Sequence, residues 1–389
     1  MSIRIVFNTR YSEAACSIFY RDAFASLNNM AFSDWDNYDH YDIALFMTYE
    51  RDIKDLVAAK RKYPNLKVGL IDPRGSQVVY YLKYVDFLVV DSLEMKDFFA
   101  GYQLPMFQYY EYPNIENRAK KHIKKERIII GYHGNIVHIA GMYPNVTVAL
   151  ERLSEEFKIE LWAMYNIKTL GECSFGLPNN MQVKHIQWSE ENYHNYLSKA
   201  DLGIVPNLMP IKNINQIKKK AQVCRSFFND SPDDYLIRFK MPSNPGRIII
   251  FGKMGIPVVT DFYPSALQFI QDEHNGMLAC SAGGWYCALE KLICNHSLRQ
   301  KMADNMFQTI KKHFDFEIQN KNLMEFLVSM MGESKKRESI IIEKSEETLL
   351  DNSNFKKSML QLKARGKIIS SIRNGLKIKL KQWCQKRHN

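Results

Sequence analysis

The chain has 389 residues, of which 46% are apolar and 24% charged, and its net charge is +11. This composition predicts a globular protein of two or three domains, and it excludes a mostly disordered chain and a small disulfide-stapled scaffold. The seven cysteines form no C-x-x-C pair, which favours reduced thiols in a cytosolic setting and argues against a zinc site. The first residues read as a strand, so we expect no signal peptide. No apolar run reaches the ~18–20 residues of a spanning helix.

The excess positive charge belongs to the C-terminal tail. Residues 352–389 contain eight Lys and three Arg but no acidic residue, so residues 1–351 carry no net charge. The body of the protein therefore lacks the basic surface expected of a nucleic-acid-binding protein.

In chain order, short apolar strands alternate with helical patterns, as in a parallel sheet buried on both faces. We expect strands over residues 3–7, 43–47, 68–71 and 87–90, and helices over 17–27 and 53–62. A Lys- and Arg-rich stretch, residues 117–127, is interpreted as a linker. The alternation then resumes, with strands over 128–132, 159–163, 183–186, 202–205 and 256–259. Helices are expected over 145–157, 190–199 (capped by Ser189), 245–254, 284–292 and 298–313. This pattern predicts an α/β protein with two doubly wound, Rossmann-like domains, residues 1–117 and 127–331.

Residues 332–389 combine a polar linker with a basic amphipathic segment over residues 364–384. Apolar side chains share one helical face there and Lys and Arg flank it, a pattern typical of a helix lying on a membrane surface (Ile368, Ile372, Leu376, Leu380 and Trp383). A basic helix docked on the body and a disordered tail are the alternatives.

Residues 238–259 contain the most informative motif. Asn244 can cap a helix that begins at Pro245, and Gly246 allows a ligand to approach the backbone closely. Lys240 and Arg247 beside the N–H groups of this helix start form an anion site suited to a diphosphate. The alternative is an ordinary capped helix. Two cations crowded at a helix N-terminus favour the anion site, because they repel each other unless an anion is bound.

Two further motifs lie at the carboxyl ends of expected strands, where α/β folds bind ligands. The turn Gly131–Asn135 carries His133, which, like His138, can donate to a phosphate or act as a base; a tight connection with structural histidines is the alternative. Asp201 is expected to be a structural residue at the start of the strand that leads to Asn207. Trp188, with His185 and Gln187, can frame a nucleobase or simply pack in the core.

The run ADLGIVP, the segment Lys-Met-Pro-Ser-Asn and the following MGIPVVTD resemble the C-terminal domain of GT-B glycosyltransferases. The closest resemblance is to family 4 (group 1), whose bacterial members build surface polysaccharides. It extends from Ile128 to Phe326 and is one of pattern alone over residues 1–116. It implies a metal-independent transfer, with retention favoured over inversion, from a nucleotide-diphosphate sugar to a glycan or lipid-linked acceptor. We therefore expect a cytoplasmic enzyme bound peripherally to the membrane through residues 364–384.

The resemblance also implies roles for single residues. Lys240 and Arg247 neutralise the diphosphate leaving group, and a helix over 314–330 crosses back to the N-terminal domain. The donor site is completed by two segments of backbone (Gly131, Gly134 and Asn135; Ser243, Asn244, Gly246 and Ile248).

The sequence departs from the family in one respect. The two glutamates that the family often carries eight residues apart correspond to Pro242 and Ile250, so contacts to the donor-sugar hydroxyls come from elsewhere or are absent. An inverting enzyme needs a general base, for which Asp72 is the candidate, with Glu13 and His133 as alternatives; Asp72 can also simply cap a turn.

Other readings stay open. The insertion over residues 209–234 can be a lid, an acceptor loop or a solvated loop. A nucleotide-sugar epimerase, a phosphorylase and a non-catalytic membrane scaffold subunit on the same architecture are the alternative functions.

Overall fold

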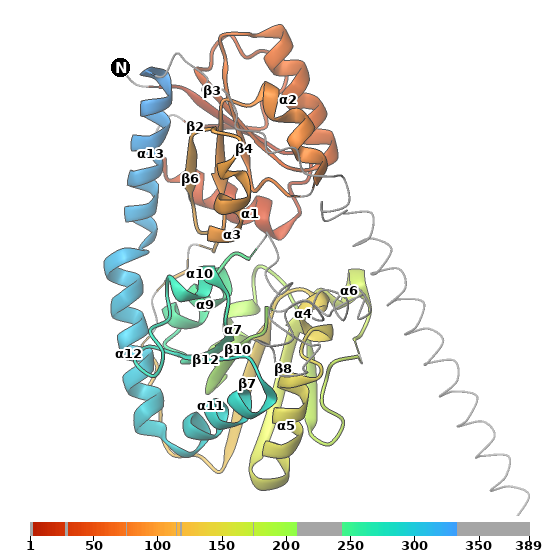
Figure 1. Ribbon diagram of the computed structural model, residues 1–389, viewed down its shortest axis with the longest axis vertical. Coiled ribbons are helices and arrows are strands. Elements are labelled where there is room, and N and C mark those ends of the chain that lie inside the picture. Colours follow the sequence, from red (N-terminus) through yellow and green to blue (C-terminus); the bar gives the residue numbers. More distant parts are fainter. Residues whose placement is uncertain are drawn as a thin grey trace, which may run out of the picture.

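The computed structural model describes residues 3–27, 30–74, 76–113, 115–116, 119–173, 175–207 and 243–332. They form two units, one above the other in Figure 1, and each unit is built on a parallel sheet of six strands. The insertion over residues 209–234, Lys240 and the amphipathic segment over residues 364–384 lie outside the described residues.

The N-terminal sheet has the strand order β2-β1-β3-β4-β5-β6. The central strands are buried along their length, because helices cover both faces of a parallel sheet. The strands are β1 (Ile5–Asn8), β2 (Met30–Phe32), β3 (Ile43–Met47), β4 (Lys67–Ile71), β5 (Phe87–Val90) and β6 (Met106–Gln108). The helices of this unit are α1 (Ala15–Ala25), α2 (Glu50–Lys62) and α3 (Leu93–Ala100), with a 3-10 helix, η1, over Ser76–Tyr84.

The C-terminal sheet has the order β12-β11-β10-β7-β8-β9, so the chain enters at its centre and turns outward in both directions. Ligands bind where such a sheet changes direction, here between β7 and β10. The strands are β7 (Arg127–His133), β8 (Lys158–Tyr165), β9 (Gln182–Gln187), β10 (Leu202–Val205), β11 (Val258–Asp261) and β12 (Met277–Ala279). The helices are α4 (Ile136–Ala140), α5 (Asn145–Glu156), α6 (Ile167–Leu170), α7 (Tyr193–Leu197), α9 (Gly246–Lys253), α10 (Pro264–Leu267), α11 (Ala282–Cys294) and α12 (His296–His313).

The last described helix, α13 (Phe316–Gly332), returns to the N-terminal unit and lies along one side of it (Figure 1). The Asn320 amide donates to the Ala23 carbonyl and the Ser26 hydroxyl of the α1 end, at 3.1 and 2.6 Å. Phe326 packs edge-on against Phe87 of β5, with 5.5 Å between ring centroids. This is the crossing helix that the resemblance implied.

Several expected elements need correction. The helix expected over residues 190–199 is the single turn α7. It begins only at Tyr193, and the Ser189 backbone carbonyl, not its side chain, accepts from the N–H groups of Asn192 and Tyr193. The strand expected over 256–259 starts two residues later, at Val258. The short strands β2, β6 and β12 and the 3-10 helix η1 were not predicted.

The basic linker is held on the C-terminal unit. Lys120 donates to the carbonyl oxygens of Ser198 (2.7 Å) and Ala200, and Lys125 pairs with Asp201 at 2.5 Å. Asp201 also accepts from the Ile129 N–H at 3.0 Å, which confirms its structural role at the start of a strand. None of the helices in the described ranges has the length and apolar character needed to span a bilayer.

Candidate functional site between the two sheets

The carboxyl ends of strands from both sheets meet where the units touch. After β5, the Leu93 N–H donates to the Ser265 hydroxyl at 2.8 Å, and Ser265 in turn pairs with Glu94 through its N–H (3.1 Å) and its hydroxyl. The first N–H groups of a helix have no partner within it. Here Ser265 accepts from the N–H group at the start of α3, and Glu94 accepts from an N–H group at the start of α10. Gln108 of β6 bonds to Gln268 at 2.9 Å.

Arg247, in the first turn of α9, lies at the change of direction between β7 and β10. Its guanidinium donates to the Pro206 carbonyl at 3.0 Å and to the Asn207 side-chain oxygen at 3.1 Å. A side chain on Gly134 would approach the Arg247 side chain to 3.2 Å, so the glycine turn lies directly beside it. Within the described ranges Arg247 forms no ion pair. The three sequence motifs therefore converge on a cation that has no acidic partner in the part of the chain that the structure describes.

The start of α9 differs from the expected one. The helix begins at Gly246, one residue late, and the Asn244 side chain accepts from the Gly246 N–H at 3.0 Å. The Ile248 N–H donates to the Pro245 carbonyl at 2.8 Å. Two of the N–H groups that we expected to face a diphosphate are thus already bonded, and the charge of Arg247 is the main anion-binding feature that the structure describes here.

Position 246 must be a glycine, but for a reason other than the predicted one. A Cβ atom there would overlap the carbonyl oxygen of Glu111, which belongs to the N-terminal unit. The close approach to this glycine is therefore made by the protein's own backbone and not by a ligand. Ser243 is buried beside it and accepts from the Asn207 side chain at 3.2 Å.

His133 does not suit the roles of cation or base. Its side chain is 7% exposed and packs edge-on against Phe251 of α9, 5.0 Å between ring centroids. Burial, followed by the neighbouring charge of Arg247, lowers the pKa of His133 to about 3, so the ring is neutral at pH 7. Its Nε2 atom has no hydrogen-bond partner among the described residues, which leaves a buried polar atom beside Arg247.

The other predicted donor-site residues have structural partners. The Asn135 side chain caps α4 by accepting from the Val137 N–H at 3.0 Å, and a side chain on Gly131 would meet Ala200 at 2.8 Å. Trp188 is half-buried, stacked on Tyr193 at 6.4 Å and packed against the core, which favours the packing alternative for this residue. His138 is buried in α4.

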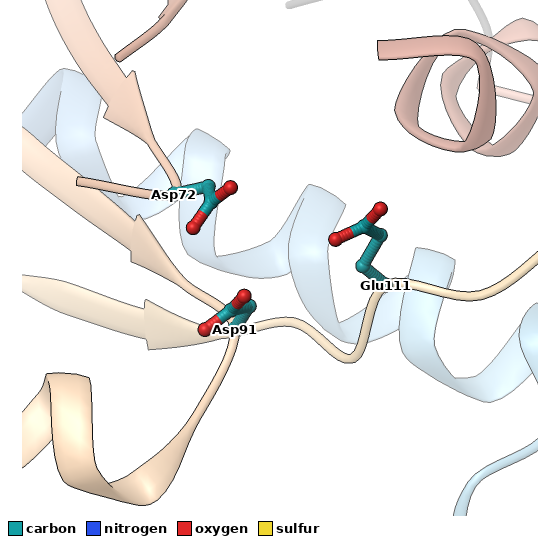
Figure 2. A group of neighbouring side chains, drawn as sticks. All are labelled: Asp72, Asp91 and Glu111. Carbon is teal, nitrogen blue, oxygen red and sulfur yellow. The ribbon is translucent and has the colours of Figure 1, made fainter. Parts of the chain in front are cut away.

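Three carboxyl groups of the N-terminal unit converge near this interface (Figure 2). Asp72 follows β4, Asp91 follows β5, and Glu111 lies just beyond β6, so adjacent strands bring them together. One oxygen of each lies within 4.8 Å of the others. The Arg74 guanidinium contacts Asp72 and lies 3.8 Å from Asp91 and 3.9 Å from Glu111. Oxygen ligands of this kind suit a hard cation, but here Arg74 already supplies positive charge.

Burial dominates the electrostatics of these three carboxyl groups, which we call the carboxyl cluster. Asp72 and Asp91 are 1% and 0% exposed, and burial raises the pKa of both. Burial, opposed by Arg74 and reinforced by Asp72, raises the pKa of Glu111 to about 7. Asp72 is thus enclosed and paired with Arg74, and in this arrangement it is not open to an acceptor as the predicted general base would be.

Sequence reasoning missed Glu111, the member of the cluster that faces the C-terminal unit. The Asn244 side-chain nitrogen lies 2.7 Å from its carbonyl oxygen and 3.3 Å from its carboxylate. The available signal was its position directly after a strand next to those that end in Asp72 and Asp91, but β6 has only three residues and was itself missed.

No protein-family model and no curated protein matches the sequence. Several solved structures resemble the fold. The chain is 12% identical to Anabaena HepE in complex with UDP-glucose, with 84% of this chain and 100% of that one covered and a TM-score of 0.59. Sucrose-phosphate synthase from Thermosynechococcus elongatus shares 10% identity, with 86% and 100% covered and a TM-score of 0.57. The lipopolysaccharide outer core galactosyltransferase WaaB shares 10%, with 84% and 99% covered and a TM-score of 0.52. The chain therefore has the two-domain α/β architecture of the GT-B glycosyltransferases.

Proposed function

We propose that this protein is a glycosyltransferase that moves a sugar from a nucleotide-diphosphate sugar to a glycan or lipid-linked acceptor. The observation that carries the proposal is the position of Arg247, without an ion-pair partner in the described ranges, where the C-terminal sheet changes direction. Fold likeness supports it, since Anabaena HepE, similar over 84% of this chain, was solved with UDP-glucose.

The chemistry follows from charge. As the bond between sugar and phosphate breaks, negative charge grows on the β-phosphate, and a fixed guanidinium directed at that charge stabilises the transition state. Two units in contact around the donor exclude water and so limit its hydrolysis. Lys240, outside the described residues, is proposed to assist Arg247.

The finer assignments are part of the same proposal. The resemblance to family 4 supports transfer without a metal, with retention of configuration, in bacterial surface polysaccharide synthesis. The basic amphipathic segment over residues 364–384 supports a peripheral location at the cytoplasmic membrane face. The anomeric configuration of the product, read by nuclear magnetic resonance, tests retention; an inverted product contradicts it.

A non-catalytic subunit of the same fold is the second candidate. The observation in its favour is that the N–H groups of Gly246 and Ile248 are already bonded within the chain. Such a subunit would bind its partner and the membrane without binding a nucleotide.

Thermal unfolding of the full chain with UDP, GDP, CMP, ADP or dTDP separates the two. A ligand at about 100 times its dissociation constant stabilises the fold by roughly 2.7 kcal/mol. We expect one nucleotide to raise the melting temperature of the wild type and to have no effect on Arg247→Ala. The control is Arg127→Ala, exposed at the opposite end of β7, which keeps the response. A wild type that responds to no nucleotide supports the scaffold, and a response retained by Arg247→Ala refutes the assigned site.

A further inference from the structure

Glu111 brings a carboxylate of the N-terminal unit to the start of α9 in the C-terminal unit. Its side chain is 10% exposed, and its Oε2 atom lies 3.3 Å from the Asn244 nitrogen and 3.9 Å from the Arg74 guanidinium. Its carbonyl oxygen accepts from the same Asn244 nitrogen at 2.7 Å and lies against Gly246. Glu111 is therefore fixed beside the residue that precedes Arg247.

The surroundings of Glu111 have hydrogen-bonding capacity that no described residue uses. Among the described residues, neither carboxylate oxygen of the fully buried Asp91 accepts a hydrogen bond of normal geometry, and the Arg74 guanidinium lies 3.8 Å away. The Tyr20 hydroxyl, on α1, is also fully buried and has no hydrogen-bond partner in the part of the chain that the structure describes. Burial, followed by the nearby charges of the carboxyl cluster, raises the pKa of Tyr20, so its hydroxyl is neutral at pH 7. Buried polar groups nearly always have hydrogen-bond partners. We therefore infer that a polar ligand supplies the missing partners in this region.

A nucleotide-diphosphate sugar fits that requirement. Its diphosphate needs a cation, which Arg247 supplies, and its sugar presents several hydroxyl donors directly beyond the phosphate. At a pH above its raised pKa of about 7, the Glu111 carboxylate is ionised and accepts hydrogen bonds only, which makes it a strong partner for hydroxyl groups. Glu111 contacts Asn244 and Gly246, and Gly246 directly precedes Arg247 in the chain. We therefore expect its carboxylate to meet the sugar when Arg247 binds the diphosphate.

We propose that Glu111 is a specificity-determining residue of the donor site, whose carboxylate accepts hydrogen bonds from hydroxyl groups of the donor sugar. Arg74 positions that carboxylate through its contacts with Asp72 and with Glu111 itself. The proposal rests on the proposed function, and it deepens it: the sugar is recognised by the N-terminal unit, whereas the diphosphate is bound by the C-terminal unit.

Calorimetric titration of the full chain with a bare nucleotide and with its sugar derivatives tests the proposal. The probes are UDP, UDP-glucose and UDP-galactose, or GDP, GDP-mannose and GDP-fucose if the thermal experiment selects GDP. The wild type should bind one sugar nucleotide more tightly than the bare nucleotide. In Glu111→Gln, which is nearly isosteric, we expect affinity for that sugar nucleotide to fall about tenfold and affinity for the bare nucleotide to change less than twofold. The matched control Glu116→Gln, exposed five residues away, should change neither.

Each other outcome is decisive. If Glu111→Gln weakens the bare nucleotide and the sugar nucleotide equally, Glu111 supports the fold and not the sugar, and the proposal is wrong. The same holds if the variant weakens neither, or if the wild type binds sugar nucleotides no better than the bare nucleotide. A wild type that binds no probe refutes the proposed function as well, which distinguishes the two failures.

Discussion

Replacing Gly246 by Ala places a methyl group in space that the Glu111 backbone of the N-terminal unit already occupies. The new Cβ would lie inside the 3.0 Å that real Cβ atoms keep from the Glu111 carbonyl oxygen, and this neighbour is backbone, which cannot rotate away. The two units must therefore separate at this point. Overpacking of this kind destabilises by about 1–3 kcal/mol, and the hydrogen bond from Asn244 to Glu111 contributes about 1 kcal/mol more if it is lost.

The higher helix propensity of alanine opposes this loss of stability, and a second glycine in a helix serves as the comparison. Alanine is favoured over glycine in a helix by up to about 1 kcal/mol, so Gly246→Ala should lose a net 1–3 kcal/mol. Gly283, in α11, has nothing within 4 Å of its absent side chain, and Gly283→Ala should be neutral or stabilising by up to about 1 kcal/mol. Urea unfolding measures both variants, and small-angle X-ray scattering should show a larger radius of gyration for Gly246→Ala alone. A Gly246→Ala protein as stable and as compact as the wild type would refute the assigned contact.

Two further predictions concern the same interface. Because the pKa of Glu111 is raised from 4.5 to about 7, its protonation contributes stability that is fully present below about pH 4.5 and lost as the pH rises through 7. At 1.36 kcal/mol per pH unit the shift amounts to about 3 kcal/mol. Urea unfolding at pH values from 5 to 8 should therefore show the free energy of unfolding of Glu111→Gln rising relative to that of the wild type as the pH rises. A difference between the two proteins that stays constant with pH would contradict the shift. Ser265→Ala removes the hydroxyl that bonds to the Leu93 N–H and to Glu94, and it should lower the free energy of unfolding by about 1 kcal/mol. The control Ser329→Ala, at an exposed position on α13, should lower it little. Equal losses in the two variants would argue against the cap between the units.

The parts of the fold that the sequence predicted well are those where burial leaves a continuous apolar run. The strands over residues 43–47, 87–90 and 202–205 were predicted with the bounds that the structure has. The strands β2 and β6 were missed because each has three half-buried residues at the edge of a sheet, too few to form a pattern. Local sequence also could not distinguish the single turn α7 from a longer helix.

The convergence of residues around Arg247 was predicted in part because strand ends share an edge. That rule brought together the turn at Gly134, the loop at Asn207 and Arg247. It did not reveal that Phe251 of α9 encloses His133, because this packing depends on the crossing of two distant segments. The carboxyl cluster was missed for a similar reason: its members are about twenty residues apart and meet only through the order of strands β4, β5 and β6.

The return of α13 has a consequence for any attempt to study the halves of this molecule separately. Leu323, Leu327 and Met330 of α13 are buried in the same cluster as the apolar residues of β1 and β3. A fragment cut after the basic linker would leave that apolar surface of the N-terminal half bare to water, which favours aggregation. A soluble N-terminal half would instead call for a shortened gene in which a short linker replaces residues 114–315 and joins residues 3–113 to residues 316–332. The two ends to be joined already lie close together, because the Tyr112 hydroxyl donates to the Phe314 carbonyl at 2.8 Å. A short linker therefore suffices.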